Sequence, residues 1–268
     1  MIFTNFIQNR RSVRLFQTKY LDDDMKSSVN NAIERVLDEE KSSGIDIKPI
    51  YSGFEVYNEL DGKAGYSGVM VKAPAYISLK YKEINPANKI YGAFQMEKLI
   101  TRLIGLGLDI CWITLEPGPT PEKVKLFGDD AEFIEYIVAI GYAEEKKPFT
   151  PEATSGRKEV SEIVFGDEPF KSISIEELNR RGLLDIFSSI RFAPSHKNLQ
   201  PWKFVVSNDK VSLYILNNES IDISLGDAGI IMYYFYELAH GSGIKSEWEI
   251  CDLNTKVEDY VLLAEYKL

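Results

Sequence analysis

The sequence predicts an α+β fold made of two similar lobes. Sliding the chain along itself by about 136 residues aligns segment 105–112 with segment 241–248, which share two glycines and a tryptophan. The same shift aligns two strand-like segments, 76–81 and 212–217, each of which precedes a helical pattern. Two repeats are too few for a solenoid, so we expect a two-lobed body with approximate twofold symmetry.

The pattern of apolar residues places helices and strands in both halves. Apolar residues recur every three or four positions over 96–104, which predicts an amphipathic helix. Segment 230–239 is apolar or aromatic nearly all round, so we expect a helix that is buried on several sides, where the two lobes meet. Segments 133–140 and 203–207 are rich in β-branched and aromatic residues, which indicates strands. The stretch 176–187 is expected to be an exposed helix.

A linker region is expected between the lobes. Segment 144–156 is rich in charged residues, proline and small residues. We place the lobe boundary near residue 165, so that the lobes span residues 1–165 and 166–268.

Composition excludes several classes of protein. A formal net charge of -10 argues against general nucleic-acid binding, which needs massed Lys and Arg. No apolar run near the N-terminus is long enough for a signal peptide or a membrane span, so we expect a cytoplasmic protein without a membrane partner. Cys111 and Cys251 lack CxxC spacing, which gives no support to a disulfide scaffold or a metal site.

A basic motif, Arg-Arg-Ser-Val-Arg, lies at residues 10–14. In an extended chain Arg10, Ser12 and Arg14 point to one side. Two guanidinium forks and a hydroxyl suit a phosphate dianion. The alternative is a solvated basic loop.

A second motif, at residues 193–204, is stiffened by two prolines. Pro194 and Pro201 fix their own φ angles and bias the preceding residues to extended backbone. A preorganised turn of this kind places Ser195 and Asn198 accurately. Trp202 is expected in the core at the start of a strand.

Together these motifs resemble those of the FMN-dependent nitroreductase family. In that family the flavin lies at a dimer interface and takes one motif from each subunit. Here each half of one chain keeps one motif, since residues 34–44 lack the Pro and Asn of the second motif and residues 179–182 lack the serine of the first. The resemblance therefore implies a nitroreductase-like fold packed as an intrachain pseudo-dimer, with one FMN per chain and a monomer in solution.

The resemblance also implies a set of cofactor-binding residues. The first motif contacts the flavin phosphate and ribityl chain, a basic pair at 157–158 closes the phosphate pocket, and the backbone at 114–115 faces flavin N5. The second motif contacts the flavin ring or the ribityl hydroxyls, and Lys197 is a candidate for the N1–C2 edge. His196 replaces the usual small residue; it narrows the substrate face, contacts the phosphate or points to solvent, and we favour exposure. The full set is Arg10, Arg11, Ser12, Arg14, Thr114, Leu115, Arg157, Lys158, Pro194, Ser195, His196, Lys197, Asn198 and Gln200.

The function implied is an FMN-dependent oxidoreductase that passes electrons from NAD(P)H to a small organic acceptor. No protein side chain is expected to be catalytic, and the chain has no Gly-x-Gly-x-x-Gly fingerprint for a separate nicotinamide domain. Alternatives are a non-catalytic flavin-binding or flavin-sensing protein, and an interaction module that has lost flavin. The intact pair of motifs argues against loss.

Overall fold

A computed structural model of the chain describes residues 10–65, 68–145, 156–217 and 221–268. The chain forms two compact units. Of the described residues, 10–145 belong to the N-terminal unit and 156–268 to the C-terminal unit. The predicted linker, 144–156, falls almost entirely outside the described residues.

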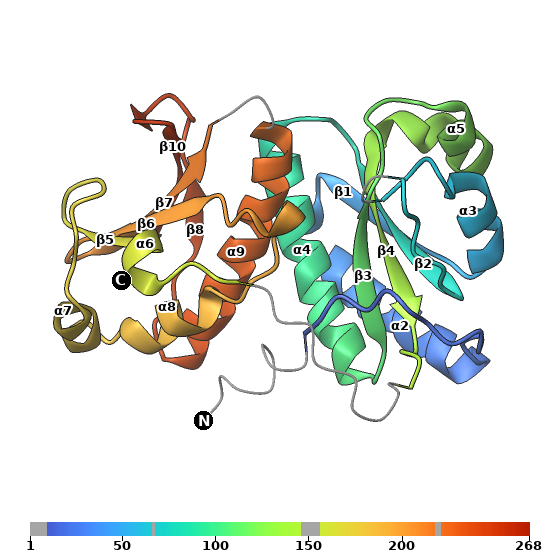
Figure 1. Cartoon of the computed structure of the whole chain (residues 1–268), viewed down its shortest axis with the longest axis horizontal. Coiled ribbons are helices and arrows are strands. Elements are labelled where there is room, and N and C mark those ends of the chain that lie inside the picture. Colours follow the sequence, from blue (N-terminus) through green and yellow to red (C-terminus); the bar gives the residue numbers. More distant parts are fainter. Residues whose placement is uncertain (1–9, 66–67, 146–155, 218–220) are drawn as a thin grey trace. The chain divides into compact units, whose positions relative to one another are not determined.

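The N-terminal unit, coloured blue to green in Figure 1, is built on a four-stranded sheet. Its strands are β1 (Ile45–Ile50), β2 (Ala75–Tyr81), β3 (Asp109–Thr114) and β4 (Ile134–Gly141). They lie in the order β1-β2-β4-β3, and all neighbours are antiparallel. Their side chains are mostly apolar and buried, because both faces of the sheet are covered.

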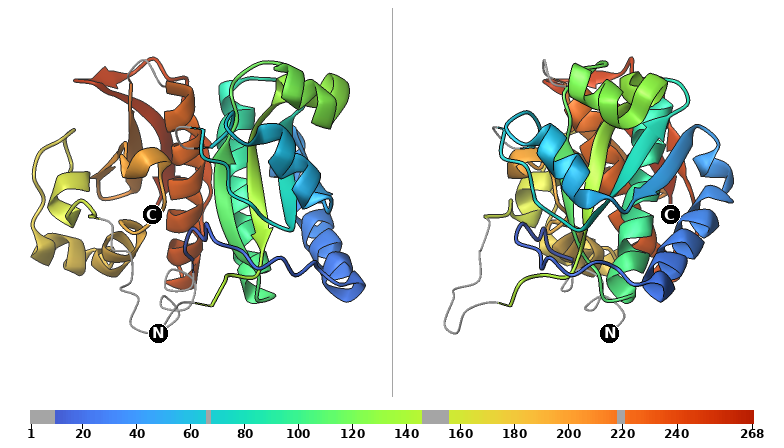
Figure 2. Two further views of the ribbon diagram at one scale, coloured as in Figure 1. Left: turned by 45° about the vertical axis from the view of Figure 1, so that its right-hand side comes forward. Right: turned by 90° about the vertical axis from the view of Figure 1, so that its right-hand side faces the viewer.

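Each face of this sheet has its own hydrophobic core. On one face lie α2 (Asp23–Leu37) and α4 (Pro86–Gly105), together with the short η1 (Glu40–Ser42). On the other face lies α3 (Gly53–Leu60), which contacts α5 (Pro121–Phe127), and η2 (Gly128–Phe133) follows α5 (Figure 2). The helices begin where capping residues allow: Asp22, Asn85 and Thr120 each accept a backbone N–H with the side-chain oxygen.

The C-terminal unit, coloured yellow to red in Figure 1, is built on a six-stranded sheet. Its strands are β5 (Val164–Gly166), β6 (Trp202–Val206), β7 (Lys210–Leu216), β8 (Trp248–Ile250), β9 (Lys256–Val257) and β10 (Tyr260–Lys267). The order is β5-β6-β7-β10-β8, with β9 paired to β10. Only the β5–β6 pair is parallel in the described sheet.

An aromatic core joins this sheet to its helices. Helices α8 (Leu184–Ile190) and α9 (Ile221–Gly241) supply Phe187 and Phe235, which pack with Phe204, Trp248 and Tyr266 of the strands. The shorter helices α6 (Val160–Ile163), α7 (Ile175–Arg180) and η3 (His196–Asn198) complete the unit. Trp202, at the start of β6, is 1% exposed, which confirms its expected place in the core.

The two units repeat one arrangement, as the sequence predicts. In the N-terminal unit β1, β2, α4, β3 and β4 follow in chain order, and in the C-terminal unit β6, β7, α9, β8 and β10 do the same. The sheet orders β1-β2-β4-β3 and β6-β7-β10-β8 also correspond. The residues 230–239 lie in α9 and are mainly buried, as expected. Two similar lobes of an α+β fold are therefore confirmed.

Two details differ from the sequence prediction. The exposed helix expected over 176–187 is broken at Gly182, whose φ of 72° ends α7 before α8 begins at Leu184. It is also not exposed throughout, because Leu178, Ile186 and Phe187 are buried. Residues 156–165, which a boundary near 165 assigns to the first lobe, lie in the C-terminal unit, where Val164 pairs with Phe204.

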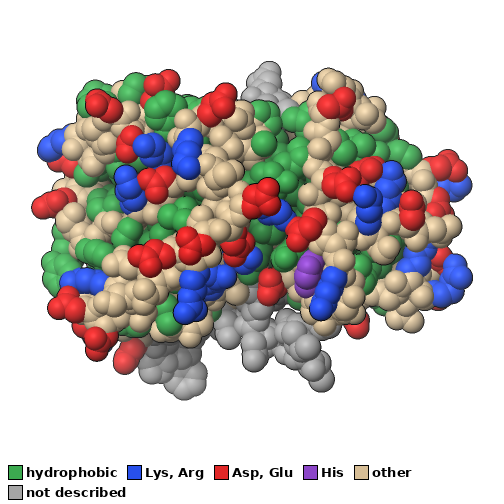
Figure 3. Space-filling view, turned by 180° about the vertical axis from the view of Figure 1, so that it is seen from behind, with side chains coloured by type: hydrophobic (Ala, Val, Ile, Leu, Met, Phe, Trp, Pro, Cys, Tyr) green, Lys and Arg blue, Asp and Glu red, His purple; other side chains and the backbone are tan. Residues whose placement is uncertain are grey.

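Among the described residues, no helix is both long and apolar enough to cross a bilayer. No three His, Cys, Asp or Glu side chains in this part of the chain gather in a way that suits a metal ion. On the face shown in Figure 3, basic side chains are interspersed with acidic ones.

Candidate functional site

The Arg-Ser motif runs in an extended conformation beside the edge strand of the N-terminal sheet. Ser12 forms a parallel bridge with Ile110 of β3, and the Val13 N–H donates to the Ile110 carbonyl oxygen at 2.8 Å. Val13 and Phe16 are buried against the core of the α3 face. This anchoring fixes the backbone on which Ser12 and the arginines stand.

Arg10 is held by a buried carboxylate that the sequence motif did not reveal. Its Nε lies 2.9 Å from Glu97 Oε1, and its side chain is only 4% exposed. Glu97 comes from α4, and its Oε2 accepts the indole N–H of Trp112 at 2.8 Å. The glutamate therefore links the arginine motif to the tryptophan of the internal repeat. The amphipathic pattern gives no signal of this contact, because it places Glu97 with Lys98 on the polar face of the helix, whereas the Glu97 side chain is fully buried.

The other residues of the motif differ in their surroundings. Arg10 Nη1 donates to Ser12 Oγ at 3.1 Å, so these two side chains lie on the same side, as the alternation predicts. Arg14 is exposed, while Arg11 lies 3.7 Å from Asp109. Burial raises the pKa of the Cys111 thiol, and the nearby charges of Arg14 and Arg10 partly oppose that rise. Both guanidinium groups thus act on the same part of β3.

Thr114 and Leu115 lie at the end of β3, where their backbone groups already have partners. The Leu115 N–H donates to the Glu135 carbonyl oxygen at 2.9 Å, and the Thr114 carbonyl oxygen accepts the Gly65 N–H at 3.1 Å. Leu115 is also buried. Presentation of the Leu115 N–H to a flavin ring would require this hydrogen bond to open.

The loop that follows is held by a buried lysine. Lys123 Nζ donates to the carbonyl oxygens of Glu116 and Gly118 at 2.9 and 2.7 Å. Burial lowers the pKa of Lys123. Helix α5 begins at Pro121, directly after this loop. A hollow of about 390 Å³ lies beside it, and Leu115 is part of its lining.

In the C-terminal unit, the proline-bracketed motif folds into a tight and strained turn. Lys197, Asn198 and Gln200 have φ angles of 50°, 57° and 48°, a region that residues other than glycine rarely adopt. The Gln200 N–H donates to Ser195 Oγ at 2.9 Å, and the Asn198 N–H donates to the Ser195 carbonyl oxygen at 3.0 Å. Backbone strain of this kind concentrates at functional sites.

The basic pair joins this turn from about forty residues away in sequence. Arg157 Nη1 donates to Asn198 Oδ1 and to the Ala193 carbonyl oxygen. The Lys158 N–H donates to Gln200 Oε1 at 2.9 Å, and Lys158 Nζ donates to the Gln200 carbonyl oxygen at 2.9 Å. Burial lowers the pKa of Lys158. The structure thus brings together Arg157, Lys158, Asn198 and Gln200, and it places all four in one unit.

His196 is less exposed than the sequence suggests. Its side chain is half-buried, and burial together with the charge of Lys197 lowers its pKa. Its backbone N–H donates to Asp227 Oδ1 of α9 at 2.9 Å. Lys197 is exposed, while Pro194 is half-buried.

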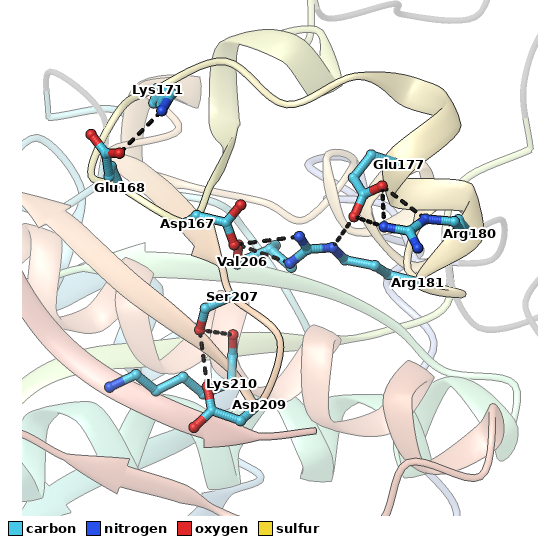
Figure 4. Close-up of polar contacts among 10 residues, drawn as sticks. All are labelled: Asp167, Glu168, Lys171, Glu177, Arg180, Arg181, Val206, Ser207, Asp209 and Lys210. Carbon is cyan, nitrogen blue, oxygen red and sulfur yellow. Dashed lines mark hydrogen bonds and ion pairs between the residues drawn. The ribbon is translucent and has the colours of Figure 1, made fainter.

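A separate polar hollow of about 490 Å³ lies elsewhere in the C-terminal unit. Figure 4 shows its charged side chains. Arg181 donates hydrogen bonds to Glu177 and Asp167, and Arg180 donates to Glu177. These charges are satisfied by one another, and none of the predicted cofactor-binding residues lines the hollow.

Comparison with known proteins identifies a family. Residues 3–239 match the model of a family described as "Putative TM nitroreductase". A search of curated proteins found no match.

A solved structure shares the fold over nearly the whole chain, and others match about half of it. A "putative nitroreductase" from Thermotoga maritima MSB8 is 22% identical, with a TM-score of 0.63 over 97% of this chain and 93% of that one. A nitroreductase with bound FMN from Bacteroides fragilis NCTC 9343 is 16% identical, with a TM-score of 0.45 over 57% of this chain and 94% of that one. An FMN-dependent nitroreductase from Clostridium difficile R20291 is 19% identical, with a TM-score of 0.43 over 55% and 90%. The fold is shared over the whole chain with the first of these, and the family model covers most of the sequence. The chain therefore belongs to this nitroreductase family.

Proposed function

We propose that this chain is an FMN-dependent oxidoreductase, which passes electrons from NAD(P)H through one bound FMN to a small organic acceptor. Membership of the nitroreductase family supports an oxidoreductase. The observation that carries the cofactor proposal is the gathering of Arg157 and Lys158 on the strained turn that also holds Asn198 and Gln200.

The donor groups present suit the parts of FMN. A phosphate dianion needs guanidinium, ammonium and hydroxyl donors, and the chain gathers these at its two motifs despite a net charge of -10. In the N-terminal unit Arg10, Ser12 and Arg14 supply them. In the C-terminal unit Arg157 and Lys158 do so.

We assign roles to these residues as follows. Arg10, Ser12 and Arg14 would hold the phosphate and ribityl chain, with Arg157 and Lys158 completing the phosphate site. Ser195 Oγ accepts one hydrogen bond in the turn, which leaves its proton to donate to the ribityl chain or ring. The exposed Lys197 would place a positive charge at the N1–C2 edge.

Bound FMN would supply the redox chemistry, by accepting hydride from the nicotinamide and passing electrons to the acceptor. The protein's own contribution is to bind, orient and balance charge, so no side chain is assigned a catalytic role. One FMN per chain is proposed, because each half of the sequence keeps only one of the two motifs. A monomer then suffices for activity.

Flavin binding and reduction can be tested separately. FMN added to the purified chain should bind, and the complex should show the flavin absorbance at about 450 nm. NADH or NADPH should bleach this absorbance under anaerobic conditions. Re-oxidation by a series of nitroaromatics, quinones and enones would then identify the acceptor class. Absence of FMN binding would reject the cofactor proposal, whereas binding without reduction by either nicotinamide would favour a non-catalytic flavin-binding or flavin-sensing protein.

A further inference from the structure

Asp227 is a buried carboxyl group directly beside the proline-bracketed turn. It lies in α9 and is 4% exposed. Its Oδ1 accepts the His196 N–H at 2.9 Å. Its Oδ2 is also buried and has no hydrogen-bond partner among the described residues.

The turn needs an anchor outside itself. Three of its residues adopt positive φ angles without being glycine, and each such residue costs of the order of 1–3 kcal/mol. Its internal hydrogen bonds, from Gln200 and Asn198 to Ser195, close the loop, and Arg157 and Lys158 hold Asn198 and Gln200 from outside it. None of these hydrogen bonds ties the turn to a helix. The contact between His196 and Asp227 does so, because α9 is a long helix packed on the sheet.

Stability of the fold does not account for an aspartate at this position. A carboxyl group with one unsatisfied buried oxygen is unfavourable compared with an apolar residue of similar size. Leucine has nearly the same shape and would pack among the apolar neighbours of α9, but it cannot accept the His196 N–H. The role of the Asp227 side chain is therefore to hold the backbone of His196 in place.

We propose that Asp227 is a positioning residue, whose carboxyl oxygen holds the His196 N–H and so fixes the turn of residues 195–200 in the conformation in which Asn198 and Gln200 bind Arg157 and Lys158. The proposal rests on the proposed function only in naming FMN as the ligand of the site that this turn and the basic pair form. The conformational part concerns this chain alone.

Two substitutions separate hydrogen bonding from packing. Asp227→Leu keeps the branched shape and removes the acceptor, while Asp227→Asn keeps an amide oxygen that can accept the same N–H. Leu238→Ala is the matched control, because Leu238 is a buried residue near the other end of α9. It loosens packing without touching the turn.

Hydrogen exchange of the protein without FMN tests the positioning role. Relative to the amides of β6, exchange at residues 196–200 should be about tenfold faster in Asp227→Leu, and unchanged in Asp227→Asn and Leu238→Ala. Unchanged exchange in Asp227→Leu, or equally fast exchange in Asp227→Asn, would overturn the proposal. Should Asp227→Leu fail to fold, Asp227→Ser, whose side chain is too short to reach the N–H, carries the same comparison.

Flavin affinity is the second readout. Asp227→Leu should bind FMN about tenfold more weakly than the wild type, and Asp227→Asn should recover wild-type affinity. If the wild type does not bind FMN, the proposed function fails, while the exchange experiment still decides whether Asp227 positions the turn. If the wild type binds FMN and Asp227→Leu binds it equally well, the positioning role is rejected and the function stands.

Discussion

At the scale of single residues, Glu97 connects parts of the N-terminal unit that lie far apart in sequence. It binds Arg10 through one carboxylate oxygen and Trp112 through the other. Buried ion pairs of this kind contribute little net stability, but removing one partner leaves the other charge in a low-dielectric environment. The role of Glu97 is therefore to define where Arg10 stands.

The coupling between Arg10 and Glu97 can be measured. Glu97→Ala should lower the free energy of unfolding by about 3–5 kcal/mol, because Arg10 loses a buried carboxylate. The double variant with Arg10→Ala should lose clearly less than the sum of the two single variants, as urea unfolding would show. Additive losses would mean that the two side chains do not depend on each other.

Arg14 offers a cleaner test of phosphate binding, because it is exposed. Arg14→Ala should weaken FMN binding by about 1.5–3 kcal/mol, the range for hydrogen bonds to charged groups, and leave the unfolding free energy nearly unchanged. Arg35→Ala, at an exposed arginine of α2, is the control and should bind FMN as the wild type does. Equal affinity of both variants would remove Arg14 from the site.

Asp227 predicts an unusual dependence of stability on pH. Burial raises its pKa from the ordinary 3.8 to about 7. The folded state therefore holds this proton more tightly than the unfolded chain does, so its contribution to stability is complete below about pH 4 and is lost as the pH rises through about 7. With about 1.4 kcal/mol per pKa unit, the whole change is about 4 kcal/mol.

Comparison with Asp227→Asn isolates this group, because the amide does not titrate. Urea unfolding at pH 5 and pH 8 should show that the advantage of Asp227→Asn over the wild type grows with pH. Glu177 and Asp130 have lowered pKa values, so both are ionised at pH 5 and at pH 8 and do not contribute to the difference. The lowered pKa of His196 acts in the opposite direction within this interval, and the histidine is present in both proteins. Parallel pH profiles would show that Asp227 is ionised at both pH values or is not buried.

At the scale of elements, the helix pair α7 and α8 shows what sequence patterns miss. From the sequence one helix is expected over 176–187, yet Gly182 adopts a φ of 72° and ends α7. The Gly182 N–H donates to the Asn179 carbonyl oxygen and the Leu183 N–H to that of Leu178, which satisfies the end of the helix. A glycine that follows basic residues, as Gly182 follows Arg180 and Arg181, is a signal for the end of a helix.

Substitution of Gly182 tests this explanation. Gly182→Ala should destabilise the chain by about 1 kcal/mol, because a Cβ is disfavoured at positive φ although nothing crowds it. Gly105→Ala, at the end of α4, is the control: its position is equally open but has no positive φ, so it should be neutral or stabilising in thermal unfolding. Equal effects at the two positions would contradict a left-handed requirement at Gly182.

The candidate site was only partly predictable from sequence. Local sequence patterns predict the strand that carries Lys203 and Phe204, the amphipathic helix around Leu99 and the core position of Trp202. These patterns depend only on near neighbours in the chain. Glu97 and Asp227 did not emerge, because each acts through a partner more than thirty residues away. The basic pair at 157–158 was recognised only by resemblance, and its contact with Asn198 required the fold.

At the scale of the whole molecule, the two units repeat one order of strands and helices, but the motifs are divided between them. Arg10, Ser12 and Arg14 belong to the N-terminal unit, while Arg157 and the turn of residues 195–200 belong to the C-terminal unit. A duplicated fold with unequal motifs is the basis of the proposal that one chain binds one flavin. This division is the central claim of the proposed function.

Equilibrium titration of the chain with FMN, followed by flavin fluorescence, tests that claim most directly when the wild type is compared with Arg14→Ala and Asn198→Ala. The account predicts one FMN per chain and weaker binding at that same single site in each variant. Two flavins per chain, or a loss of affinity in only one of the two variants, would contradict it.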